Sequence, residues 1–188
     1  CAVIRARFLP SRIGWKGKGA SALRFALYDR RAAVLYAHRW AYGRNPAFYD
    51  YEGLGGDCTN FASQCIYAGS GVMNFTPTFG WYYIDSNQKA PAWTGVPYLY
   101  NFLTRGERSA GPVARPCDME DVRPGDVIQL SFDGESFRHT PVVVAVGRPA
   151  SAENILIAAH SYDADDRPLS TYEYKDIRFL KIYGVWKP

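Results

Sequence analysis

Apolar residues recur at helical spacing in two segments of the chain. In residues 30–42 they fall three or four positions apart, which predicts a helix that ends near Gly43. A second helix is predicted from Cys58 to about Ala68, again with one apolar line along it. Asp57, directly before this helix, is expected to act as its N-cap through the carboxylate. The apolar residues in the two segments are Ala33, Val34, Ala37, Trp40 and Ala41, followed by Phe61, Ala62, Cys65, Ile66 and Ala68.

The later part of the chain shows the alternating and continuous apolar patterns of strands. The predicted strands are 127–132, 140–146, 155–159 and 178–185. Pro141 is expected among the first residues of its strand, because proline cannot donate to a sheet ladder. Before the strands, 72–97 is predicted to be a long ordered loop rich in aromatic residues, with a short helix at 96–105, and 161–171 reads as a polar loop. Helices followed by antiparallel strands indicate an α+β fold, with N-terminal helices packed on a small antiparallel sheet.

The positive charge of the chain is concentrated near its N-terminal end. The 22 basic and 18 acidic residues give a net charge of +4, but six basic residues and no acidic ones lie within 1–27. We therefore expect a basic leader at 1–27, poorly ordered or non-native, and one domain at 28–188. This domain has no basic stripe that would predict nucleic-acid binding. The chain has no run of about 20 apolar residues that would predict a transmembrane helix.

Three of the four cysteines, Cys58, Cys65 and Cys117, lie in the predicted domain. An odd number argues against a disulfide framework and leaves room for one functional thiol. If Cys58 and Cys65 share a helix, their Cα atoms are about 10 Å apart, which is too far for a disulfide.

Cys58 is the candidate nucleophile. It follows a Gly-Gly-Asp loop and opens a predicted helix, where free amide hydrogens and the helix dipole would stabilise a thiolate. The same amides could stabilise an oxyanion on a substrate carbonyl. A nearby Asp57 carboxylate would oppose this by raising the pKa of the thiol, unless capping turns it onto the backbone. The alternative is a small buried apolar residue at a helix start.

Two of the three histidines adjoin predicted strands. His139 precedes the apolar run 140–146 and could take the thiol proton, and His160 ends the strand 155–159 and could orient His139. The alternative for His139 is a surface position at a strand edge. The rival orienters for His139 are Asp163, Asp165 and Asp166. His38 is expected to pack in a helix or face solvent.

The segment from Gly56 to Cys65, with the sequence GDCTNFASQC, resembles the signature of the putative amidase domain family. That family is part of the papain-like group, which also contains NlpC-type and CHAP-type cell-wall hydrolases. The helix at 28–42, the RPGDVI segment at 123–128, His139 before an apolar strand and His160-Ser161 support the resemblance, which covers roughly 28–185.

The resemblance implies a papain-like cysteine hydrolase that cleaves amide or peptide bonds through a thioester acyl-enzyme. It implies Cys58 as nucleophile, His139 as base and His160 as orienter, with no cofactor and no metal. Pro141 departs from the family pattern, which has a small residue there. No upstream glutamine is evident as an oxyanion donor, so Asp57 and Asn60, or a tyrosine within 49–51, are the supporting candidates. Trp81 and Tyr82 could line the substrate cleft or else cover the core from a long loop.

The family also implies a peptide, amide or peptidoglycan substrate and a secreted or cell-wall location, and we expect a monomer. Two other readings stay open. One is a catalytically inactive papain-like module that binds peptides or glycans. The other is a zinc site built from Cys58, Cys65 and the histidine pair, although the chain has no Cys-x-x-Cys spacing.

Overall fold

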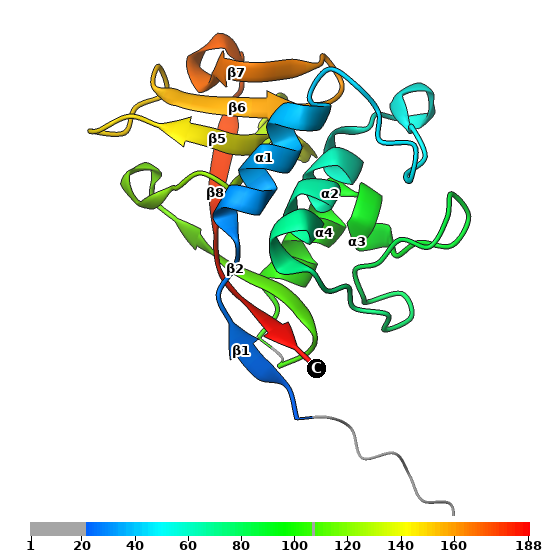
Figure 1. Cartoon of the computed structure of the whole chain (residues 1–188). Coiled ribbons are helices and arrows are strands. Elements are labelled where there is room, and N and C mark those ends of the chain that lie inside the picture. Colours follow the sequence, from blue (N-terminus) through cyan, green and yellow to red (C-terminus); the bar gives the residue numbers. More distant parts are fainter. Residues whose placement is uncertain (1–21, 107) are drawn as a thin grey trace, which may run out of the picture.

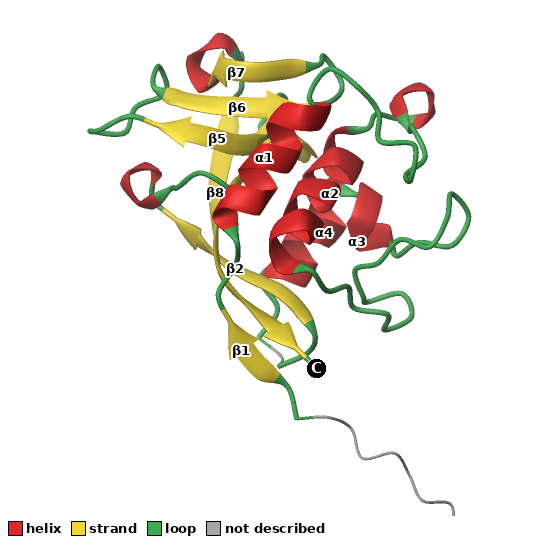
Figure 2. Ribbon diagram, in the orientation of Figure 1, coloured by secondary structure: helices red, strands yellow, loops and turns green. Residues whose placement is uncertain are grey.

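The computed structural model describes residues 22–106 and 108–188, which form an α+β fold. Figures 1 and 2 show the helices gathered beside one continuous antiparallel sheet. The described helices are α1 (Arg30–Trp40), α2 (Cys58–Ser70), α3 (Pro91–Thr94) and α4 (Val96–Leu103). No helix in this part of the chain has the length and apolar character needed to cross a membrane.

Eight strands make up the sheet in the described residues, twice the number predicted. They are β1 (Arg24–Ala26), β2 (Gly111–Cys117), β3 (Val127–Ser131), β4 (Phe137–His139), β5 (Val142–Val146), β6 (Ile155–Ala159), β7 (Ala164–Pro168) and β8 (Asp176–Lys187). The order is β1-β8-β3-β5-β6-β7, with β2 paired to β8 and β4 paired to β3.

Adjacent residues of β3 contribute to two separate apolar cores. Val127 belongs to the cluster that includes the helices, and Ile128 belongs to a second cluster formed with β6 and the segment before β8. This alternation is expected for a strand whose two faces are both covered. The side chains of α1 and α2 pack into the first cluster, and 11 of the 13 residues of α2 are buried. Helix α2 is therefore the central helix, and its N-terminus carries Cys58.

The strands missed by the sequence patterns have polar or proline-containing sequences. β7 has the sequence ADDRP and forms the edge of the sheet next to β6, where polar residues and proline are tolerated. β2 contains Pro112 and Pro116, and pairs only with β8. The predicted polar loop 161–171 thus contains a strand.

Strand β1 falls inside the predicted leader. Arg24–Ala26 pairs with Val185–Lys187 at the end of β8, so this part of the leader belongs to the sheet, as Figure 1 shows. The prediction of a poorly ordered leader is therefore wrong for residues 24–26. The rest of that prediction, for residues 1–21, lies outside the described residues.

His139 ends a strand where the sequence predicted that it would open one. β4 stops at His139, and β5 starts at Val142. Pro141 lies in the break between them, and its carbonyl oxygen accepts a hydrogen bond from the Ile128 amide at 3.0 Å. His139 itself pairs with Leu130 of β3, so the break begins after His139 and both strands stay attached to β3.

The contact between the start of α1 and the end of α2 requires a residue without a side chain at position 69. A Cβ on Gly69 would lie 2.7 Å from the Asp29 carbonyl oxygen and closer still to the Tyr28 ring. We predict that Gly69→Ala lowers the free energy of unfolding by about 1–3 kcal/mol, measured by urea denaturation. Gly53→Ala is the control, because nothing lies within 4 Å of that position. Equal stability of the two variants would contradict this packing.

Candidate active site

A cleft of about 560 Å³ opens beside the N-terminus of α2. It brings together residues that are far apart in the sequence, from the start of α2, from β4 and from the segment around β7. Its lining includes Cys58, Arg138, His139, Ser161, Arg167 and Tyr172. The predicted nucleophile and the predicted base therefore share one cleft.

Cys58 is the first residue of α2 and is positioned by the Gly-Gly turn before it. Gly55 and Gly56 both have φ of 105°, a conformation that side chains disfavour. A Cβ on Gly56 would also lie 3.0 Å from the Ser161 hydroxyl. That hydroxyl accepts a hydrogen bond from the Asp57 amide at 2.8 Å. The chain entering α2 is thus held against the turn that follows β6.

Asp57 does not cap α2 with its side chain, contrary to the sequence prediction. Its Oδ1 accepts hydrogen bonds from the Tyr51 amide at 3.0 Å and from Asn60 Nδ2 at 2.8 Å, and its Oδ2 contacts His160 Nδ1 at 2.5 Å. The carboxylate is directed to these partners because they surround it in a fully buried position. The Asp57 side chain therefore accepts no hydrogen bond from the first-turn amides of α2.

His160 does not orient His139, because both of its ring nitrogens have other partners. Nδ1 contacts Asp57, and Nε2 lies 2.8 Å from the Trp40 carbonyl oxygen. A carbonyl oxygen can only accept, so Nε2 carries a hydrogen and a second proton lies between Nδ1 and the Asp57 carboxylate. The ring also stacks on Phe61 with centroids 4.0 Å apart. His160 is a buried structural residue with no free nitrogen to act as a base.

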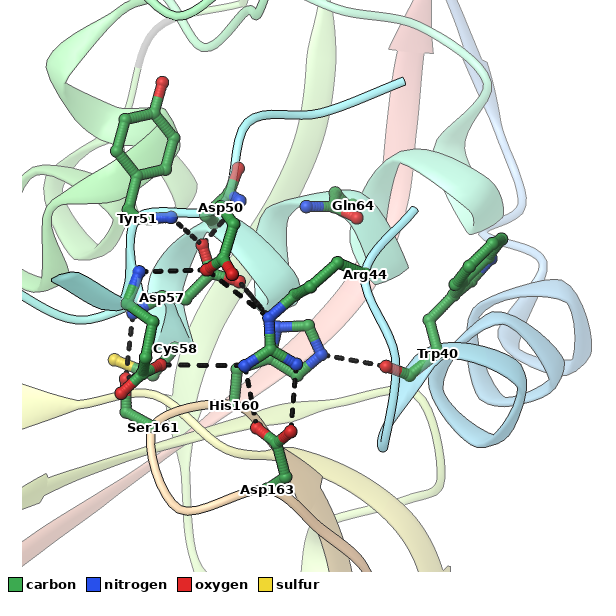
Figure 3. Close-up of polar contacts among 12 residues, drawn as sticks. Trp40, Arg44, Asp50, Tyr51, Asp57, Cys58, Gln64, His160, Ser161 and Asp163 are labelled. Atoms are coloured by element: carbon green, nitrogen blue, oxygen red, sulfur yellow. Dashed lines mark hydrogen bonds and ion pairs between the residues drawn. The ribbon is translucent and has the colours of Figure 1, made fainter. Parts of the chain in front are cut away.

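Arg44 lies among the acidic groups on the outer side of the Asp57–His160 pair (Figure 3). Its Nη1 and Nη2 donate hydrogen bonds to the two carboxylate oxygens of Asp163, at 2.9 and 3.0 Å. Its Nε lies 3.4 Å from the Asp50 carboxylate and 3.9 Å from the Asp57 carboxylate. Figure 3 also shows that the Cys58 sulfur points away from the His160 ring. The thiol is thus directed away from this ionic cluster.

Cys58 lies against the backbone that leads into His139. Its Sγ is 3.9 Å from the Arg138 carbonyl oxygen and 3.7 Å from the Thr59 hydroxyl, which in turn contacts the Thr140 hydroxyl at 3.3 Å. Cys58 is 7% exposed and His139 is 5% exposed. Only the cleft side of the two residues is open to a ligand.

Burial shifts both residues toward their uncharged forms. It raises the pKa of the Cys58 thiol, although hydrogen bonds from Thr140 and Thr59 partly oppose it, and the Asp57 charge adds to the rise. Burial lowers the pKa of His139 to about 4, and the positive charge of Arg167 contributes. Within this cleft a neutral thiol and a neutral imidazole are therefore favoured over a thiolate and an imidazolium.

Tyr172 is the third residue of the site, and the sequence reasoning did not identify it. Its hydroxyl lies 3.4 Å from His139 Nε2, and the two rings are 5.4 Å apart. Tyr172 also contacts Arg167, whose guanidinium carbon is 4.0 Å from the ring centroid. No local motif marks this tyrosine, because it lies 33 residues beyond its histidine partner.

The other predicted site residues lie outside the cleft. Asn60 is buried, and its amide is fully engaged with Tyr49, Asp57 and Trp93, so it has no free donor for an oxyanion. Trp81 is completely buried in the core, with its indole donating to Ser63.

Tyr82 is half-buried and stacks on Phe75 at 5.2 Å. Trp81 therefore belongs to the core, whereas Tyr82 lies outside the cleft and packs against the exposed Phe75. Both lie in the 72–97 loop.

Comparison with known proteins gives one family. A profile described as "Putative amidase domain" matches residues 27–183. The chain belongs to this family. Its description indicates a hydrolase that acts on amides, and the matched segment of this amidase-family chain contains Cys58, His139 and Tyr172.

The chain is also similar to a curated protein without an assigned activity. "Uncharacterized protein YhbB" of Bacillus subtilis (strain 168) is 35% identical over 140 residues. The match covers 73% of this chain and 42% of that protein, so the chain spans less than half of the relative's length. No solved structure matches the amidase-family chain.

Metal-ligating side chains come together at one place in the described residues, outside the cleft. His38, Asp165 and Asp166 have ligand atoms within 4.8 Å of one another. His38 Nδ1 contacts Asp165 at 2.8 Å, and the group is largely exposed. Cys65, which the zinc reading required, is completely buried in the apolar core of this amidase-family domain.

Removing the Asp57 charge should destabilise the amidase-family fold. Asp57→Asn leaves the proton-bearing His160 and the nearby Arg44 without their buried counter-charge, so we expect a loss of about 3–5 kcal/mol in the free energy of unfolding. Guanidinium denaturation followed by circular dichroism measures it. Asp163→Asn is the matched control, since its half-exposed pair with Arg44 should contribute about 0–1 kcal/mol. A similar small loss in both variants would contradict the role given to Asp57.

Proposed function

We propose that this protein is a papain-like cysteine hydrolase that cleaves amide or peptide bonds through a thioester acyl-enzyme. The observation that supports it is the position of Cys58 at an uncapped helix N-terminus, in one cleft with the buried imidazole of His139. The family description, which names an amidase, agrees with this chemistry.

In the proposed first step, the Cys58 sulfur attacks the substrate carbonyl carbon while His139 takes the thiol proton. The mechanism requires the tautomer in which His139 Nε2 donates to the Tyr172 hydroxyl, 3.4 Å away, because this tautomer leaves Nδ1 with the lone pair that accepts the proton. The tetrahedral intermediate then collapses: the C–N bond breaks, and the imidazolium returns the proton to the departing amine. A thioester on Cys58 remains.

In the second step, water attacks the thioester carbon, again with His139 as base. The C–S bond breaks, the thiol recovers its proton and the carboxylic acid product leaves. The oxyanion formed in both steps is stabilised by first-turn amides of α2, which the Asp57 side chain does not cap. Because the resting pair is neutral, proton transfer accompanies the attack of sulfur on the carbonyl.

The substrate proposed here is a peptide amide of peptidoglycan, by analogy with cell-wall hydrolases of the papain-like group. The second candidate function is a binding module that keeps the fold without hydrolysis. The raised pKa of the Cys58 thiol is the observation that favours it, because a neutral thiol is a weak nucleophile unless a base acts with it.

The first test of this proposal removes the sulfur. Cys58→Ser should abolish the release of fragments from purified peptidoglycan, measured by mass spectrometry, because a hydroxyl at this position is a far weaker nucleophile. The variant should still fold, with a loss of no more than about 1–3 kcal/mol in the free energy of unfolding, because the new hydroxyl is more polar than the buried thiol it replaces. Cys117→Ser is the matched control and should hydrolyse normally. Hydrolysis by Cys58→Ser would refute the assignment, and absence of hydrolysis in the wild type on peptidoglycan and peptide amides alike would favour the binding module.

The second test uses pH. The base form of His139 is present above a pKa of about 4, so the acidic limb of kcat/KM should have its midpoint near pH 4 instead of near 6.5. The unfolded chain binds the proton at a higher pH than the folded one, so stability also falls as pH drops below about 6.5. Circular dichroism at each pH separates loss of fold from loss of the base. A midpoint near 6.5 in folded protein would contradict a buried neutral imidazole.

A further inference from the structure

Arg167 places a positive charge inside the candidate cleft. It lies in β7 and lines the cleft together with Cys58 and His139. Its guanidinium rests on the Tyr172 ring, and Tyr172 contacts His139. A ligand that reaches Arg167 is therefore one aromatic ring away from the proposed base.

The guanidinium is held along one edge by Thr171, and it also interacts with the Tyr172 hydroxyl. Nε donates to the Thr171 hydroxyl at 2.6 Å, and Nη2 donates to the Thr171 carbonyl at 3.0 Å. These two nitrogens form the side edge of the group. The end edge, formed by Nη1 and Nη2, keeps the planar fork geometry that matches a carboxylate with two parallel hydrogen bonds.

The charge of Arg167 is not neutralised by an acid of the described residues within salt-bridge distance, unlike other charges at the cleft. Arg138 pairs with Asp133 at 3.3 Å, and Glu52 lies 3.8 Å from Arg44. Glu173 also lines the cleft but is exposed and forms no ion pair with Arg167. A half-buried guanidinium, braced on a ring and left without a counter-charge, is suited to an anionic ligand.

We propose that Arg167 binds a free carboxylate of the substrate, so that the preferred substrates are amides that carry a carboxylate close to the scissile bond. This inference rests on the proposed function, because it assigns the substrate class of the same site. The carboxylate can come from an acidic side chain or from a chain terminus, and both present the same fork of oxygens.

The electrostatics of the cleft agree with this assignment. The Arg167 charge lowers the pKa of His139, so the two groups interact across the cleft. A bound carboxylate would offset that charge and make the imidazole more basic. An acidic substrate would thus strengthen the base that acts on it, whereas a neutral one would not.

Calorimetry with the Cys58→Ala variant tests the inference without turnover. The probes are acetylated Ala/Ser hexapeptides in which one Glu is moved along the chain, each matched by a Gln peptide and each made with a free and an amidated C-terminus. We expect at least one carboxylate peptide to bind about 10- to 100-fold more tightly than its amide counterpart. Adding Arg167→Gln should remove this preference, and Arg167→Lys should retain part of it, because lysine keeps the charge and loses the fork. Arg138→Gln is the matched control and should keep the preference.

The outcomes separate this inference from the proposed function. A preference that follows the Glu position identifies a side-chain carboxylate, and one that follows the free terminus identifies a terminal carboxylate; either supports the inference. Equal binding of acid and amide peptides, a preference that survives Arg167→Gln, or no binding of any peptide overturns it. If Cys58→Ala shows the Arg167-dependent preference but the wild-type protein hydrolyses none of the peptides, only the proposed hydrolysis is refuted and the carboxylate inference stands. Hydrolysis without any carboxylate preference refutes this inference alone.

Discussion

The buried contact between the Asp57 carboxylate and the His160 ring joins most of the elements around the site. Through Asp57 it holds the start of α2 and the Tyr51 backbone, and through His160 it holds the end of β6 and the last turn of α1 at Trp40. The shared proton makes both partners necessary, because either one alone would be a charged or unsatisfied group in the protein interior. The position of the Cys58 backbone depends on this contact.

The two histidines near Cys58 thereby have different tasks. His160 is saturated with hydrogen bonds and stacked on Phe61, so it contributes rigidity. His139 lies at a break between two strands, and its ring has one hydrogen-bond contact among the described residues, to the Tyr172 hydroxyl, so one ring nitrogen is left for the proposed chemistry. This division follows from partners: a ring nitrogen that already faces a carboxylate or a carbonyl cannot accept a proton from a thiol.

Local patterns predicted the elements that depend on neighbours in sequence. The helix at Arg30–Trp40, the start of α2 at Cys58 and the strand Ile155–Ala159 were all predicted from apolar spacing. Strand β7 was missed because an edge strand does not need an apolar face. At the site, the pattern placed Cys58 correctly at the start of α2, but it placed His139 at the start of the next strand when the residue in fact ends β4. It could not show that His160 faces Asp57 or that Tyr172 faces His139, since these contacts span 103 and 33 residues and depend on register and side-chain rotation.

The contacts that position residue 58 are made by the main chain and by residue 57. Few of them involve the sulfur itself. Its sulfur lies 3.7 Å from the Thr59 hydroxyl and 3.9 Å from the Arg138 carbonyl oxygen, and it also accepts hydrogen bonds from Thr140 and Thr59. A single exchange at this one position could therefore silence the chemistry and leave the architecture intact. Within such a family, active members and members that have lost turnover would share the same scaffold. They would differ in whether residue 58 carries a sulfur atom.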